Sequence, residues 1–244
     1  MTASITLYVP RVRCLDETGG SIAERVGNDE IYLGAVFVAV SANRGFDIRV
    51  VRSREVGGNF DDGETVNWAR DLFSFDLGDA SVYPYPKGVV AALVLAERDT
   101  GNGRNDILEK LAQQFRETLT DQLIKNLVEK AKTARGRPAA NKAEEDSFIV
   151  GELKKYAADK LKELGDYLIE RAKGVIADEV FPPGIKSLDI SSENQTWNGS
   201  GDTPEEIAEF VGHDGKYQVT MYWKLRSPLV TQPSRPPVQN PPRR

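Results

Sequence analysis

The chain has little cysteine and histidine: Cys14 and His213 are the only residues of each kind among its 244 residues. A single cysteine excludes a disulfide bond within the chain, and together the two residues exclude a zinc site built from cysteine and histidine ligands. Any metal would be bound mainly by oxygen atoms. A Ser-His-Asp site would need His213, but the sequence contains no Gly-x-Ser-x-Gly elbow. The sequence therefore predicts a non-enzymatic protein.

Long apolar runs and clustered basic residues are also missing. No stretch approaches the roughly 20 apolar residues that a membrane-spanning helix needs. Met1 is followed almost directly by the strand-like segment Ile5–Val9, without the basic start and apolar region of a signal peptide. The net charge of −5 and the lack of a long basic run argue against nucleic-acid binding. We expect a protein that is cytoplasmic, or exported by a route that needs no signal peptide.

What the sequence does contain is a strong β pattern at both ends. Apolar and polar residues alternate in segments 4–14 and 71–77, and segments 31–40, 45–52 and 89–99 are further strand-like runs within the first hundred residues. A further strand is indicated at 185–190, and a clear alternation returns at 217–225. Because a terminal strand needs a partner, we expect the last strand to return to the sheets begun by residues 1–99.

Two helical segments separate these β regions. Apolar residues recur at helical spacing from Ile107 to Ala131 and again from Phe148 to Ile176, with a polar linker between them. This arrangement predicts an antiparallel helical hairpin, which either packs on the sandwich or projects from it. The predicted fold class is α+β, an antiparallel β-sandwich interrupted by a long α-helical hairpin. We assign residues 1–103 and 179–226 to the sandwich, 104–178 to the hairpin, and 227–244 to a Pro-rich flexible tail.

Acidic residues are concentrated where the predicted strands end. Glu97 and Asp99 are two residues apart, so their side chains leave the strand on the same face, and Asn105 and Asp106 follow after a Gly-rich turn. Carboxylates that are brought together repel one another, so a hard divalent cation such as Ca²⁺ would stabilise them. The pattern is suggestive of a calcium site.

The same residues have simpler interpretations. Acidic residues are common in solvated loops, and Asp106 is well placed to cap the helix that follows it. Ion pairs with Arg25, Arg98 or Arg104 would also satisfy the carboxylates.

Two segments carry a resemblance to a known family. Gly27-Asn28-Asp29-Glu30-Ile31-Tyr32-Leu33 resembles the Gly-x-Ser-Asp-Pro-Tyr-Val segment of C2 domains, the calcium- and lipid-binding β-sandwiches. The segment from Glu97 to Ile107 resembles the third calcium loop of that family. The resemblance implies that Ca²⁺ is the cofactor and that it bridges to an anionic membrane. It also implies a set of metal ligands: Asp16, Asp29, Glu97, Asp99 and Asp106.

Three functions are compatible with these patterns. The first is a non-enzymatic binding module that binds Ca²⁺ and engages a membrane surface or a protein partner. The second is a structural or assembly protein whose helical hairpin, with its apolar stripe, mediates self-association or docking. The third is a membrane-active pore-forming toxin, because amphipathic hairpins can insert into membranes.

Overall fold

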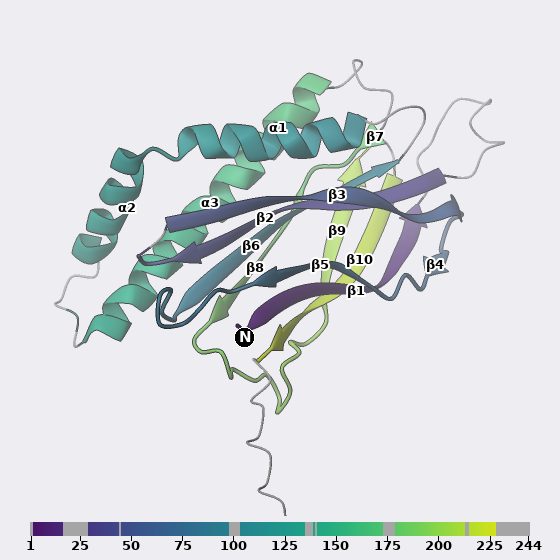
Figure 1. Ribbon diagram of the computed structural model, residues 1–244. Coiled ribbons are helices and arrows are strands. Elements are labelled where there is room, and N and C mark those ends of the chain that lie inside the picture. The colour runs from purple at the N-terminus through teal and green to yellow at the C-terminus, as the bar shows by residue number, and fades with distance from the viewer. Residues whose placement is uncertain are drawn as a thin grey trace, which may run out of the picture.

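The computed structural model describes residues 2–16, 29–43, 45–97, 103–134, 139, 141–172, 179–212 and 215–227. Within these residues the chain forms two antiparallel β-sheets and a layer of helices (Figure 1), so the predicted α+β class is confirmed. The elements, in chain order, are β1 (Ser4–Asp16), β2 (Asp29–Ser41), β3 (Gly45–Phe60), β4 (Thr65–Val66), β5 (Arg70–Asp76), β6 (Lys87–Glu97), α1 (Gly103–Thr118), α2 (Asp121–Ala134), α3 (Lys142–Ala172), β7 (Glu179–Val180), β8 (Gly184–Ile190), β9 (Glu206–Gly212) and β10 (Gly215–Arg226).

The two sheets combine strands from distant parts of the sequence. Sheet A has the order β4-β1-β10-β9, and β5 also pairs with β1. Sheet B has the order β3-β2-β6-β7, and β8 also pairs with β6. Strand β10 pairs with β1 along almost its whole length, from Ser4 opposite Arg226 to Asp16 opposite Lys216. The last strand therefore returns to the N-terminal strand, as the sequence predicts.

The molecule has three layers, with sheet B in the middle (Figure 1). One hydrophobic cluster fills the space between the sheets, and a second lies between sheet B and the helices. Along β6, Val89 and Leu93 face sheet A, whereas Val90 and Val94 face the helices. Both faces of β6 are covered, and every residue of the strand is buried. This explains why β6 has a continuous apolar run instead of an alternating pattern.

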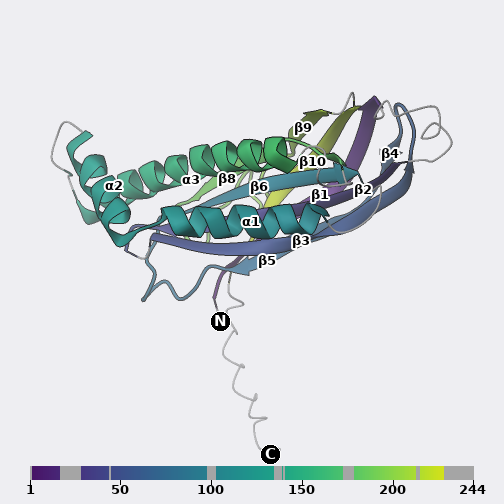
Figure 2. The same cartoon turned by 90° about the horizontal axis from the view of Figure 1, so that it is seen from above.

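Helices α1 and α3 lie along the outer face of sheet B (Figures 1 and 2). Their apolar side chains, among them Leu108 and Phe115 of α1 and Leu161 of α3, are fully buried against the strands. Of the two arrangements that the sequence leaves open, α1 and α3 therefore adopt the one in which the helices pack on the sandwich. None of the described helices is long and apolar enough to cross a membrane.

The predicted first arm of the hairpin is wrong in one respect, because it consists of two helices. Helix α1 ends at Thr118 and α2 begins at Asp121. The side-chain hydroxyl of Thr120 accepts a hydrogen bond from the backbone N–H of Leu123, at 3.1 Å. This is the bond that an N-cap residue makes. The Thr120 side chain therefore caps a new helix at a position where the apolar periodicity of the sequence predicts one continuous helix.

Candidate functional site

Four of the five acidic residues predicted to bind metal are described, and they lie at the end of the sandwich where β1 and β6 finish (Figures 1 and 2). Asp16 is the last residue of β1 and is exposed, and Asp29 begins β2. Glu97 is the last residue of β6 and is only 9% exposed. Asp106 is exposed in the first turn of α1. Asp99 lies outside the described residues.

The cross-strand register at this end places a second carboxylate beside Glu97. Glu97 lies opposite Ile31 of β2 on one side and opposite Glu179 of β7 on the other. Directly opposed residues of antiparallel strands carry their side chains on the same face, roughly 5 Å apart. Sequence analysis misses Glu179, because a strand of two residues has no periodicity to detect.

Asn105, which follows the Gly-rich turn, is used for another purpose. Its side-chain oxygen accepts hydrogen bonds from the backbone N–H and the hydroxyl of Ser53, at 3.0 and 2.9 Å. These bonds fix the start of α1 to strand β3. In the part of the chain that the structure describes, no three Asp, Glu, His or Cys side chains are grouped closely enough to hold a metal ion.

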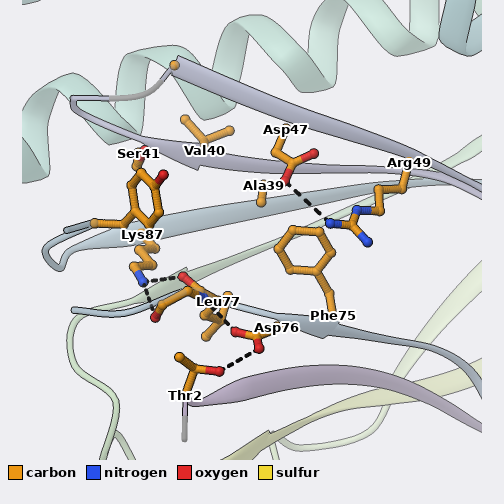
Figure 3. A pocket seen from close by; sticks show the side chains of 13 residues that line it. Thr2, Ala39, Val40, Ser41, Asp47, Arg49, Phe75, Asp76, Leu77 and Lys87 are labelled. Carbon is orange, nitrogen blue, oxygen red and sulfur yellow. Dashed lines mark hydrogen bonds and ion pairs between the residues drawn. The ribbon is translucent and has the colours of Figure 1, made fainter. Parts of the chain in front are cut away.

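A cavity of about 280 Å³ lies at the opposite end of the sandwich, between the edge strands β3 and β5 (Figure 3). The apolar part of its wall comes from both sheets and includes Phe75 and Leu77, which belong to the core between the sheets. Its polar part carries two positive and two negative side chains: Asp47, Arg49, Asp76 and Lys87. Sequence analysis does not predict this cavity.

Two of these charged side chains are engaged in holding the chain that follows β5. Lys87 is only 4% exposed, and its Nζ donates hydrogen bonds to the backbone carbonyls of Leu77 and Gly78. Asp76 accepts hydrogen bonds from the Thr2 hydroxyl at 2.5 Å and from the Gly78 N–H at 2.7 Å. Both side chains therefore form a fixed wall of the cavity.

The environment shifts the proton affinities of these groups. The hydrogen bond from Thr2, followed by that from Gly78, lowers the pKa of Asp76. Burial lowers the pKa of Lys87, although the nearby carboxylates of Asp76 and Glu193 oppose this effect. Tyr85, whose ring centroid lies 4.4 Å from the Lys87 Nζ, has its pKa raised to about 12, mainly by burial. At neutral pH Asp76 is therefore ionised and Tyr85 carries its proton.

The other two charged side chains stand at the mouth of the cavity. The guanidinium of Arg49 lies over the ring of Phe75, 4.7 Å from its centroid. Its nearest carboxylate oxygen belongs to Asp47, at 3.8 Å, which is too long for a hydrogen bond. The Arg49 side chain is 63% exposed and that of Asp47 is 28% exposed. Both groups therefore face the solvent at the entrance (Figure 3).

Comparison with known proteins gives no family for this chain. No family model, no curated protein and no solved structure matches it.

Proposed function

We propose that the chain is a non-enzymatic binding module, C2-like in its use of loops at one end of a β-sandwich, that binds Ca²⁺ and then engages an anionic membrane surface or a protein partner. The observation that carries this proposal is the position of Glu97 directly opposite Glu179, at the same end of the molecule as Asp16 and Asp29. Both glutamates also have other interactions within the protein. Two opposed carboxylates nevertheless repel each other when both are charged, and a divalent cation bound between them would relieve this repulsion. Carboxylate oxygens are the ligands that Ca²⁺ prefers.

Isothermal titration of the full chain with CaCl₂ tests the metal part of this proposal. We expect saturable binding, and a melting temperature that rises with Ca²⁺ concentration, because a ligand that binds only the folded state stabilises it. Glu97→Gln and Glu179→Gln should each weaken binding by about tenfold or more, since each removes one charged ligand. The matched control is Glu163→Gln, which changes an exposed side chain on α3. Absence of binding at millimolar Ca²⁺ contradicts the proposal.

The membrane part has a separate readout. Vesicles of phosphatidylserine should co-sediment with the protein in Ca²⁺ and release it in EDTA, whereas phosphatidylcholine vesicles should not bind it. Ca²⁺ binding without vesicle binding in either lipid would leave a protein as the partner.

A second function, assembly through the helical layer, is favoured by the exposure of α2. The apolar side chains of this helix, Leu123, Ile124, Leu127 and Val128, are only partly buried, whereas those of α1 that face sheet B are fully buried. An amphipathic helix with an incompletely covered apolar face is suited to contact a second copy of the chain. Light scattering should then show an oligomer that Leu123→Asp dissociates and Gln122→Asp, on an exposed residue of the same helix, does not. A monomeric wild-type protein would contradict this function.

A further inference from the structure

Strand β3 carries charges on the face where a sandwich normally has its core. Phe46, Ile48 and Val50 pack against the cluster beneath the helices. Asp47 and Arg49 alternate with them and so point to the opposite face, toward sheet A. The register agrees, because Arg49 lies opposite Phe37, a residue of the core between the sheets. These two charges therefore line the opening between the sheets.

The space that they face is a defined cavity and not a flat surface. Its volume of about 280 Å³ is just below the usual range for small-molecule pockets, roughly 300–1,000 Å³. Ala39, Phe75 and Leu77 supply apolar wall, as is usual for such pockets. A ligand of this size has an apolar body and a small number of polar groups.

The charges at the mouth differ from those deeper in the wall in one decisive respect. Asp76 and Lys87 make hydrogen bonds to neighbouring groups of the protein. The side chains of Arg49 and Asp47 approach each other only to 3.8 Å, and within the described residues neither side chain makes a hydrogen bond with the protein. Stacking on Phe75 holds the guanidinium plane at the entrance. The mouth thus presents one donor group and one acceptor group side by side.

We propose that this cavity binds a small zwitterion, an α-amino acid with an apolar side chain. The ligand carboxylate pairs with the Arg49 guanidinium, which has donors arranged for two parallel hydrogen bonds. The ligand ammonium pairs with Asp47, and the apolar side chain enters the cavity beside Phe75. An anion without an ammonium group would be repelled by Asp47, and a cation without a carboxylate would be repelled by Arg49. An α-amino acid carries both charges next to each other on one carbon.

Titration of the full-length protein with three probes tests this proposal: L-phenylalanine, 3-phenylpropanoate, which lacks the ammonium group, and 2-phenylethylamine, which lacks the carboxylate. We expect L-phenylalanine to shift the backbone amide NMR signals of Gly45, Asp47 and Phe75, and to bind at least about tenfold more tightly than either of the other two. Arg49→Gln and Asp47→Asn should each weaken L-phenylalanine binding by about tenfold or more. Both positions are at the surface, so the variants should fold. Arg52→Gln, an exposed arginine on the same strand outside the cavity, is the control and should bind like the wild type.

Three results would overturn the proposal. Equal binding of L-phenylalanine and 3-phenylpropanoate would show that the ammonium group is not recognised. Unchanged binding by Arg49→Gln would place the ligand elsewhere. Absence of binding by all three probes at millimolar concentration would leave Asp47 and Arg49 as charges that protect an edge strand from pairing with another chain. None of these results bears on Ca²⁺ binding, which concerns the other end of the sandwich.

Discussion

The hydroxyl of Tyr85 is buried, and no hydrogen-bond partner for it lies among the described residues. Burial, followed by the charges of Glu193 and Asp76, raises the pKa of Tyr85 from 10.0 to about 12. The unfolded chain releases this proton near pH 10, while the folded protein keeps it until about pH 12. The contribution of Tyr85 to stability is therefore complete below pH 10 and is lost as the pH rises from 10 to 12.

Tyr85→Phe tests both properties of this hydroxyl. At pH 7 we expect the free energy of unfolding to stay unchanged or to rise by up to about 1 kcal/mol, because a buried polar group without a partner is removed. Above pH 10 the variant should lose less stability than the wild type. Urea unfolding from pH 7 to 11.5 measures both effects, and the difference between the two proteins cancels the titration of Lys87. A parallel loss in both proteins would contradict the raised pKa.

At the residue scale, the sequence predicts part of the candidate site and misses the rest. The position of Asp16 at a strand end follows from an alternating pattern, and that of Glu97 follows from the end of a continuous apolar run. The grouping of charged side chains around the cavity does not follow from any pattern in the sequence. The alternation from Phe46 to Val50 identifies a strand, but it cannot show that the apolar face meets helices and the charged face meets sheet A.

At the scale of elements, the long helix α3 depends on one close contact with the chain that follows β7. A methyl group added at Gly165 would lie 2.5 Å from the Cγ and 3.2 Å from the Cδ of Pro183. Gly151 of the same helix has open space around it. The two glycines therefore make a matched pair, since alanine favours the helical backbone at both positions.

We expect Gly165→Ala to lower the free energy of unfolding by about 1–3 kcal/mol, because the rigid proline ring must shift. Gly151→Ala should raise it by about 0.5–1 kcal/mol. Urea denaturation followed by circular dichroism measures both changes. Stabilisation by both substitutions would show that α3 does not pack closely on Pro183.

The helices also show where periodicity stops being informative. Apolar spacing predicts helix over both arms, and α1, α2 and α3 overlap those segments, although α1 and α3 begin several residues earlier, at Gly103 and Lys142. The break at Thr120 interrupts no apolar period, so only the cap chemistry of the threonine followed by Asp121 indicates it. The sequence does not indicate strand β9, because the exposed apolar residues Ile207 and Val211 mask the alternation of buried Ala208 and Phe210.

At the scale of the whole molecule, the α+β class and the return of the last strand follow from the sequence. The sequence does not predict the arrangement of these elements in three layers. A fully apolar strand such as β6 requires cover on both faces, but the sequence does not specify whether a second sheet or a helix supplies each cover. The answer depends on contacts between segments far apart in the chain, and local patterns carry no record of them.

The pairing of β1 with β10 has a consequence for how the protein is made. Ribosomes add residues one at a time, so β1 is synthesised about 200 residues before β10, its partner in the central pair of sheet A. Until then β1 has only β4 and β5 as partners, and one side of its backbone stays unpaired. Contacts between such distant residues form slowly. The nascent chain therefore passes through a stage at which chaperones have an unfinished sheet edge to protect.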